Sequence, residues 1–272
     1  MAALRGLMRT IRTTRNFWTA IILRHSKKKK LVTFRDGSAF WLAWSEYWKV
    51  RDVMLAGYSV EQLGDDMFKI KNGETELIGS SDMLRTVCEL HSRFYDWDCR
   101  GKVVLDVGGF QGESAVFFSR MGAKKVIIYE PVVAHHELIK RNMSLNNVNA
   151  ELHEEGIEKV NGFRTIGYQT TDVAFGLYSK GPYKIEIRVR DVAKVIEESH
   201  ADIAKFNCEG AEESLIDVPA KVLRKIHVYM IMAHTPEIRK AIIDKFKRSG
   251  FSVVKEDKRH NFVCFERKSS EL

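Results

Sequence analysis

Short apolar runs alternate with segments of helical periodicity through the second half of the chain. The runs predict strands buried on both faces, and the segments between them predict helices. The predicted strands span 103–107, 126–129, 150–153, 202–206 and 226–232. The predicted helices span 113–121, 131–147, 192–198 and 236–248. Because strands that alternate with helices form parallel sheets, this pattern predicts an α/β fold.

Further β segments are predicted at 163–166, 173–177 and 183–189, and a terminal antiparallel hairpin at 251–255 and 262–265. The N-terminal part has a different pattern. Two hairpins are predicted around Asp36-Gly37 and Asn72-Gly73, because such pairs favour tight turns between strands. Helices are predicted at 44–55 and 82–94. We therefore expect three parts: an arm (1–35), a small α+β cap (36–100) and an α/β domain (101–272).

The turn after the first strand of the α/β domain carries three glycines, Gly108, Gly109 and Gly112, ahead of a helix. Glycine lets a backbone turn sharply and approach a ligand closely. The next strand ends in Glu130. Ligands of open α/β sheets bind outside the carboxyl ends of the strands. The pattern thus predicts a nucleoside cofactor whose ribose hydroxyls donate to Glu130.

The glycine spacing separates two kinds of nucleoside cofactor. The dinucleotide fingerprint G-x-G-x-x-G would need glycines where this chain has Phe110 and Glu113. An ionised Glu113 in the first turn of the helix would repel a pyrophosphate. The turn suits S-adenosylmethionine, with Asp106 near its ammonium group and Phe110 beside its methionine part. A nicotinamide or flavin cofactor, or a turn that binds nothing, stays an alternative.

Three segments, LDVGGFQGESAVFFSRMGAKKVIIYEP, LIKRNMSLNNV and IAKFNCEGAEESLI, together resemble the FkbM-like family of class I S-adenosylmethionine-dependent methyltransferases. The resemblance covers about residues 101–254. It implies a Rossmann-like seven-stranded sheet, transfer of a methyl group to oxygen of small or carbohydrate-like acceptors, and no metal. It also places Pro131, Glu155 and Gly156 near the cofactor. The family usually has Asp where this chain has Asn207, a further cofactor-site residue, so a cofactor-binding fold without activity stays an alternative.

Methyl transfer to a hydroxyl benefits from a group that accepts the hydroxyl proton. Two candidates follow strands on the cofactor side. His234 follows the fifth strand, and an ordinary imidazole pKa near 6.5 suits a base at neutral pH. Glu209 follows the fourth strand, where it is expected to bind the acceptor, hold the cofactor or cap the next helix. The predicted activity is methylation of a sugar-like or other small-molecule hydroxyl.

The net charge of +8 is concentrated at the N-terminus. Residues 1–35 contain ten Lys and Arg and no acidic residue, whereas the rest of the chain is close to neutral. Three interpretations stay open: a solvated surface helix, attraction to an anionic membrane or to nucleic acid, and a targeting presequence. An RNA methyltransferase that uses this arm is therefore an alternative function.

Cellular location and metal use are predicted from what the sequence lacks. The apolar stretch Phe17–Leu23 is far shorter than a bilayer span. The four cysteines are scattered, and no cluster of carboxylates and histidines has metal-ligand spacing. These features predict a cytoplasmic protein with reduced thiols and no metal site.

Overall fold

The computed structural model describes residues 2–91, 94–168, 183–258 and 260–268. The chain forms two compact units, Met1–His91 and Ser92–Leu272, called here the N-terminal unit and the sheet unit. The predicted three-part division of the chain stays a prediction.

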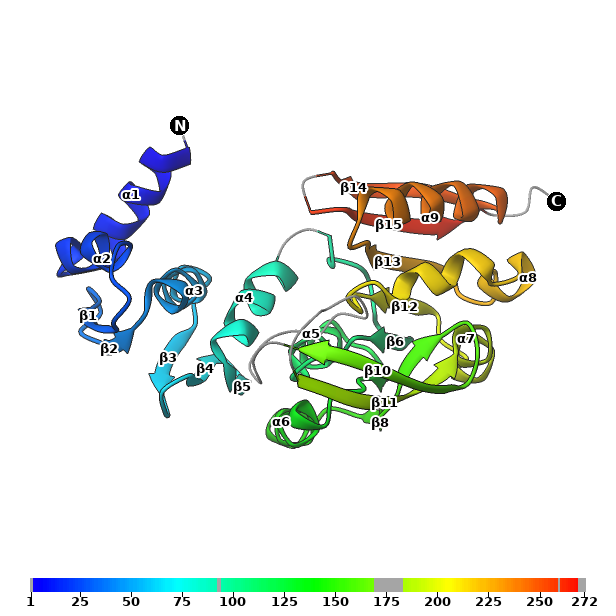
Figure 1. The fold of residues 1–272 in the computed structure, drawn as a ribbon, viewed down its shortest axis with the longest axis horizontal. Helices are drawn as coiled ribbons and strands as arrows, with labels where there is room; N and C mark the ends of the chain where they lie inside the picture. The colour runs from blue at the N-terminus through cyan, green and yellow to red at the C-terminus, as the bar shows by residue number, and fades with distance from the viewer. Residues whose placement is uncertain (1, 92–93, 169–182, 259, 269–272) are drawn as a thin grey trace. The chain divides into compact units, whose positions relative to one another are not determined.

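A seven-stranded sheet forms the centre of the sheet unit, in the order β14-β15-β13-β12-β6-β7-β8 (Figure 1). Neighbouring strands from β13 to β8 run parallel, whereas β15 is antiparallel to β13 and β14 is antiparallel to β15. This confirms the predicted fold class, including the terminal hairpin. The strands are β6 (Val103–Val107), β7 (Lys125–Tyr129), β8 (Ala150–His153), β12 (Ile203–Phe206), β13 (Val228–Met232), β14 (Phe251–Asp257) and β15 (Phe262–Arg267).

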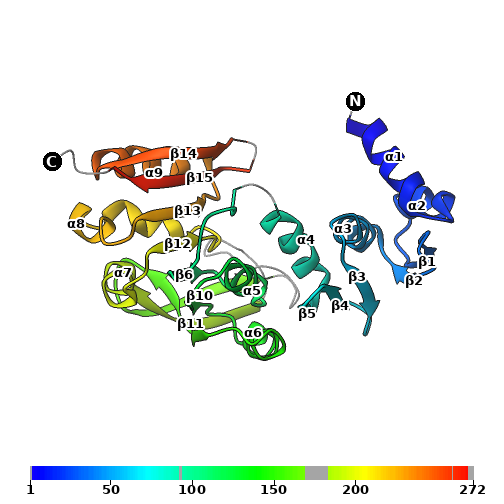
Figure 2. The ribbon, with the colours of Figure 1, turned by 180° about the vertical axis from the view of Figure 1, so that it is seen from behind.

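Helices lie on both faces of this sheet. In Figure 1, α8 and α9 lie in front of the strands, and in Figure 2 α5 lies in front. The helical elements are α5 (Glu113–Arg120), α6 (Val133–Leu145), α7 (Val192–Ser199), the 3₁₀ helix η1 (Ala211–Asp217), α8 (Ala220–Leu223) and α9 (Pro236–Arg248). The helix predicted to open at Pro131 begins two residues later. Leu145, the last residue of this helix, is 40% exposed although it is apolar.

A second sheet follows β8, with the order β10-β11-β9. It contains β9 (Gly156–Glu158), β10 (Gly162–Tyr168) and β11 (Tyr183–Asp191). The strands predicted at 163–166 and 183–189 are confirmed, and the one predicted at 173–177 lies outside the described residues. The pattern did not predict β9, because a strand of three residues is too short to show a periodicity.

The order of the strands defines where a ligand can bind. From β6 the chain proceeds outward through β7 and β8, and it then returns to place β12 on the other side of β6. This reversal is a topological switch point, and in open α/β sheets the ligand crevice lies at the carboxyl ends of the strands there. The relevant crevice is thus between the ends of β6 and β12.

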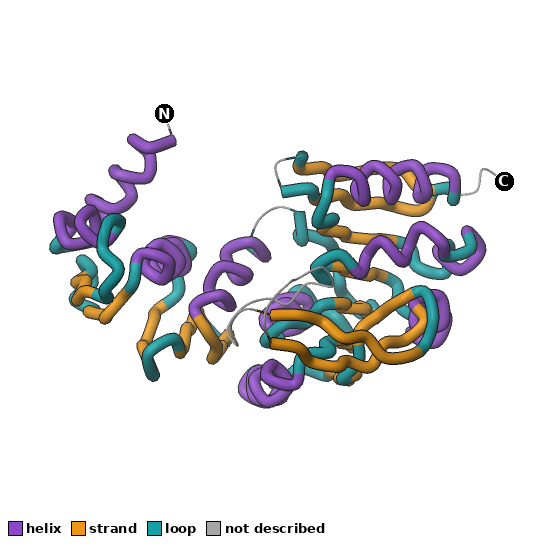
Figure 3. The backbone as a smooth tube through the Cα atoms, viewed as in Figure 1, coloured by secondary structure: helices purple, strands orange, loops and turns teal. Residues whose placement is uncertain are grey.

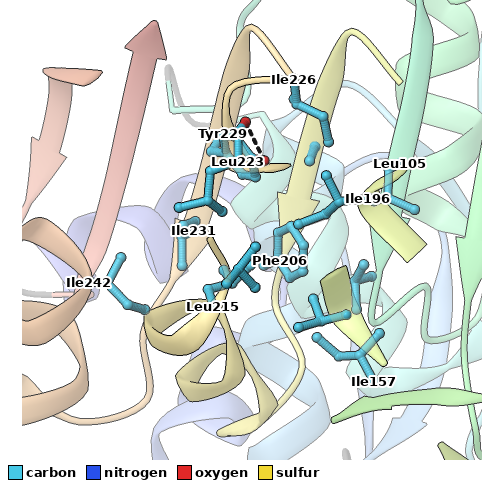
Figure 4. Close-up of a cluster of buried hydrophobic side chains, with 14 of the residues drawn as sticks. Leu105, Ile157, Ile196, Phe206, Leu215, Leu223, Ile226, Tyr229, Ile231 and Ile242 are labelled. Atoms are coloured by element: carbon cyan, nitrogen blue, oxygen red, sulfur yellow. Dashed lines mark hydrogen bonds between the residues drawn. The ribbon is translucent and has the colours of Figure 1, made fainter. Parts of the chain in front are cut away.

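A buried apolar cluster holds these strand ends in place (Figure 4). Phe206, at the end of β12, and Ile231, in β13, are fully buried within it. The Tyr229 hydroxyl donates to the Leu223 carbonyl oxygen at 2.9 Å, which satisfies the one polar atom of that buried side chain. Because such cores are close-packed, the loops that leave β12 and β13 start from fixed points.

The N-terminal unit consists of short helices and two small sheets, shown by element type in Figure 3. Both predicted hairpins are confirmed, and the helix predicted at 44–55 is present with those bounds. The helix predicted to reach residue 94 ends at Leu90, and β3 was not predicted because its sequence SVEQ is mostly polar. The elements are α1 (Ala2–Thr13), α2 (Phe17–Leu23), β1 (Lys30–Thr33), β2 (Ala39–Leu42), α3 (Trp44–Leu55), β3 (Ser59–Gln62), β4 (Met67–Asn72), β5 (Thr75–Ser80) and α4 (Ser81–Leu90).

Candidate functional site at the carboxyl ends of the strands

The turn between β6 and α5, called here the glycine loop (Gly108–Gly112), uses all of its backbone N–H groups within the protein. The N–H of Phe110 donates to the Glu130 carboxylate at 2.9 Å, and that of Gln111 donates to the Glu113 carboxyl group at 3.2 Å. The other three donate to carbonyl oxygens: Gly108 and Gly109 to Tyr129, and Gly112 to Gly109. A phosphate-binding loop needs free N–H groups that point at the ligand. This loop offers none.

Two of the loop glycines are required by packing inside the protein. Gly108 has a φ of +82°, and a Cβ there would lie 1.9 Å from the carbonyl oxygen of Asn207. A Cβ on Gly109 would lie 2.3 Å from the Ile128 side chain. The prediction explained these glycines by close approach to a ligand. The structure instead explains them by close approach to the chain after β12 and to β7.

Glu130 lies at the carboxyl end of β7, as the sequence indicated, and its side chain is almost fully buried. Its carboxylate accepts from the N–H groups of Phe110 and Val132, the latter at 3.0 Å, and it lies 3.2 Å from Nδ1 of His135. A carboxylate offers about four acceptor positions. Glu130 therefore fixes the glycine loop and retains about one position for a ligand hydroxyl.

His135 and His136 both lie on the buried face of α6. His136 contacts the Glu130 carbonyl oxygen through Nε2 at 2.8 Å. The Phe110 ring meets the His135 ring edge-on, with 4.6 Å between centroids. Both histidines thus support the end of β7 and the glycine loop.

Asp106 is fully buried and paired with Lys205, a residue that the sequence reasoning did not single out. The Lys205 ammonium donates to Asp106 and to the Gly108 carbonyl oxygen, both at 2.7 Å, and the Ser114 hydroxyl donates to the second Asp106 oxygen at 2.5 Å. Direct contact of Asp106 with a cofactor ammonium stays a prediction. The geometry favours an indirect role, in which the pair supports the glycine loop.

Glu113 begins α5 and is 1% exposed. Burial raises the pKa of Glu113 to about 8, so the carboxyl group is mostly protonated at neutral pH. The predicted repulsion of a pyrophosphate assumed an ionised Glu113 and is therefore weakened. The occupied N–H groups of the glycine loop replace it as the physical reason against a phosphate at this position.

Asn207 follows β12 directly beside Gly108. Its side-chain oxygen Oδ1 is buried and has no hydrogen-bond partner among the described residues. A buried acceptor without a donor is unfavourable by about 1–3 kcal/mol. Asn207 therefore presents an acceptor that a donor group of a ligand in the crevice would satisfy.

A second cluster lies after β12 and β13, where Glu209, Glu212 and His234 meet. Nδ1 of His234 lies 2.7 Å from Glu212, and Nε2 lies 3.3 Å from Glu209. The His234 backbone N–H also donates to Glu212 at 2.8 Å. Glu212 is fully buried, whereas the Glu209 side chain is 35% exposed. Glu209 is thus the member of the cluster that a ligand reaches most readily.

The two carboxylates set the charge of the imidazole between them. Burial lowers the pKa of His234, but hydrogen bonds to Glu209 and Glu212 and the charges of both outweigh burial and raise it to about 10. For Glu212, burial raises the pKa, but the hydrogen bond to His234 and the charge of its ring outweigh burial. The pKa of Glu212 is therefore held below its usual range. His234 is therefore an imidazolium at neutral pH, which is the wrong protonation state for the predicted base.

Pro131, Glu155 and Gly156, which the resemblance places near the cofactor, follow the carboxyl ends of β7 and β8. A Cβ placed on Gly156 would lie 3.5 Å from Cβ of Pro131, so these two residues are neighbours. Glu155 is buried and pairs with Arg188 at 2.9 Å and with Arg190 at 3.6 Å. Its carboxylate is thus held by β11.

The described part of the chain lacks the arrangements typical of metal sites and membrane spans. No group of three or more His, Cys, Asp or Glu side chains in it is arranged to hold a metal ion. None of its helices is long and apolar enough to cross a bilayer.

No family model and no curated protein matches the chain. Solved structures are similar at the level of the fold. A candidate RNA methyltransferase of Pyrococcus horikoshii has 17% identity and a TM-score of 0.44, covering 70% of this chain and 85% of its own. A ribosomal-protein methylase of Lactobacillus delbrueckii has 12% identity and a TM-score of 0.41, with 68% and 80% covered. A candidate tRNA methyltransferase of Streptococcus pneumoniae, solved with S-adenosyl-L-methionine, has 14% identity and a TM-score of 0.41, with 69% and 74% covered.

Similarity at these identities and TM-scores concerns the path of the chain, and nothing about ligand or substrate is transferred from it. Membership of the FkbM-like family stays a prediction from the sequence motifs.

Proposed function

We propose that this protein is an S-adenosylmethionine-dependent methyltransferase whose cofactor lies in the crevice between the ends of β6 and β12. One observation carries the proposal. The glycine loop has the position of a nucleotide-binding turn, yet each of its N–H groups is already bonded, two of them to acidic side chains. Such a site suits an adenosyl ligand that has no phosphate.

The side chains around the loop match the polar groups of that cofactor. Glu130 retains an acceptor position for a ribose hydroxyl. The orphaned Asn207 oxygen suits a donor, and the ammonium group of the methionine part is one. Pro131 and Gly156 offer a neutral surface for the adenine ring. When bound, S-adenosylmethionine supplies a methyl group on a sulfonium, which an acceptor displaces in line.

The protein itself positions the two reactants and takes up the proton of the acceptor hydroxyl. Holding two reactants in line supplies about 7–11 kcal/mol of a barrier, whereas a general base supplies about 10²–10⁴ in rate. We assign the proton-accepting role to Glu209, the more exposed carboxylate of the second cluster. His234 is a positioning residue in this scheme, because its ring is fixed between Glu209 and Glu212.

The acceptor we propose is a hydroxyl of a sugar-like or other small molecule, in line with the motif resemblance. RNA is the second candidate acceptor. The observation that favours it is the concentration of ten basic residues, without an acidic one, within residues 1–35. A labelled-methyl transfer screen over carbohydrates, lipids and RNA separates the two.

The binding step is tested by calorimetric titration of S-adenosylmethionine into the full chain and into Glu130→Ala. Loss of a hydrogen bond to a charged group costs about 1.5–3 kcal/mol, so affinity should fall about 10- to 100-fold. Glu137→Ala is the matched control, because Glu137 is an exposed carboxylate on α6 that is paired with Lys140 at 3.5 Å. Equal affinity in both variants, with thermal midpoints that show folded protein, would contradict the assignment of Glu130.

A further inference from the structure

An apolar stripe of helix α1 is left uncovered on the surface of the N-terminal unit. Leu7 and Met8 are 40% and 43% exposed, and the half-buried Ile11 lies one helical turn beyond Leu7 on the same side. The helix contacts its own unit beside this stripe, where Thr10 is buried and accepts from Arg51 at 3.4 Å. The packing of α1 against the unit therefore leaves Leu7 and Met8 largely uncovered.

A basic stripe runs beside the apolar one. Arg9 and Arg12 are exposed, and neither has an ion-pair partner within the described part of the chain. Met8 and Arg12 are four residues apart and hence neighbours on the helix surface. The helix thus presents apolar and cationic side chains next to each other and contains no acidic residue.

An open pocket of about 490 Å³ lies beside these arginines. It is lined by Arg9, Arg12, Asp52, Leu55, Ala56 and Cys88, which come from α1, from α3 and the residue after it, and from α4. Asp52 is paired with Arg51 at 2.8 Å, so its charge is already balanced. Leu55 is 50% exposed and extends the apolar surface. The pocket therefore combines two unpaired guanidinium groups with an apolar rim.

We propose that this surface docks the protein on an anionic phospholipid membrane. Helix α1 lies in the interface, with Leu7 and Met8 among the acyl chains, and the pocket with Arg9 and Arg12 takes a lipid phosphate. An amphipathic helix with Arg on its polar side and large aliphatic residues on the other binds membranes in this way. Arginine is suited to the phosphate, because its planar fork matches phosphate oxygens.

The side chains favour a lipid surface over RNA. Nucleic acid would be held by the arginines through its phosphates, and bases would stack on aromatic side chains. Neither interaction would use Leu7, Met8 or Leu55. Exposed Trp18 and Ile22, one turn apart on α2, add apolar surface to the same unit, and Trp is a residue that prefers the membrane interface.

The test is co-sedimentation of the full chain, without cofactor, with vesicles of phosphatidylglycerol and phosphatidylcholine. We expect binding to mixed vesicles that weakens with salt and is lost on pure phosphatidylcholine. Each arginine near an anionic surface raises the membrane partition coefficient about fivefold. Arg9→Glu/Arg12→Glu should therefore weaken binding by about 25-fold or more. Lys247→Glu/Arg248→Glu, on exposed α9 positions, changes the net charge equally and should leave binding within about twofold.

The apolar contribution has its own matched pair of variants. Leu7→Asp/Met8→Asp should weaken binding about 100-fold, since each buried aliphatic side chain is worth about tenfold or more. The control is Leu145→Asp/Val254→Asp, whose residues are exposed to a similar degree, 40% and 41%, in the sheet unit. Circular dichroism checks the fold of each variant. On the unmodified chain, anionic vesicles should slow hydrogen exchange across residues 2–13.

Three results would overturn the proposal. The first is absence of binding to mixed vesicles. The second is equal loss in the α1 variants and their controls. The third is unchanged vesicle binding by Arg9→Glu/Arg12→Glu together with lost binding of an RNA oligomer, which would make the surface a nucleic-acid site. Because the assay contains no S-adenosylmethionine, its outcome does not depend on the proposed enzymatic activity.

Discussion

Replacement of Lys205 by methionine should destabilise the sheet unit strongly, because it removes one member of a buried ion pair. The Lys205 and Asp106 side chains are 3% and 0% exposed, and their charged atoms are 2.7 Å apart. Without the ammonium, the Asp106 carboxylate keeps the Ser114 hydroxyl as its donor and has no opposite charge beside it. Breaking a buried pair in this way costs about 3–5 kcal/mol.

The measurement is urea unfolding followed by circular dichroism, with Lys225→Met as the matched control. Lys225 is paired with Glu197 at 3.5 Å, but both side chains are about half exposed. Exposed pairs contribute about 0–1 kcal/mol. The double variant Lys205→Met/Asp106→Asn should regain part of the loss, because it removes the uncompensated charge. If Lys205→Met unfolds at the same urea concentration as the control, the buried pair does not support the glycine loop as described.

Three further predictions concern ionisable and polar groups of the site. The His234 imidazole, followed by NMR, should stay protonated from about pH 6 to pH 9. Its contribution to the free energy of unfolding, at most about 5 kcal/mol, is full below about pH 6.5 and is lost as pH rises through about 10. Titration of the ring near pH 6.5 would restore His234 as a candidate base. Glu113→Gln should gain stability relative to the unmodified protein as pH rises from about 4.5 to 8, by up to about 5 kcal/mol in urea unfolding, because over this range the unfolded chain releases the Glu113 proton whereas the folded chain keeps it; a constant difference would contradict this. Asn207→Asp should bind S-adenosylmethionine about tenfold more tightly in calorimetry, since a carboxylate strengthens the bond to an ammonium; weaker binding would place that ammonium elsewhere.

The order of elements in the sheet unit could be predicted because each strand is a local signal. The apolar run before Gly108 and the one before Glu130 identify β6 and β7 without any knowledge of the partners. Helix α9 was predicted with its bounds because Pro236 is suited to a first turn and Gly250 follows the end. The predicted start of α6 at Pro131 was wrong by two residues. The chain there is held outside the helix, because the Glu130 carboxylate accepts from the N–H group of Val132.

The contacts that define the site could not be predicted from local patterns. Lys205 and Asp106 face each other because β12 returns to the side of β6, and 99 residues separate them in sequence. The one available signal was a lysine inside a strand predicted to be buried. The charge of His234 likewise depends on Glu212, which follows a different strand. No local pattern links Glu212 to His234, because the pairing of β12 with β13 is not visible in the sequence.

The most direct test of the proposed cofactor site is a pair of calorimetric titrations of the full chain, one with S-adenosylmethionine and one with NAD. A glycine loop whose N–H groups are all occupied should accept the first ligand, one molecule per chain, and give no binding heat with the second. Binding of NAD, or no heat from S-adenosylmethionine with folded protein, would contradict the account.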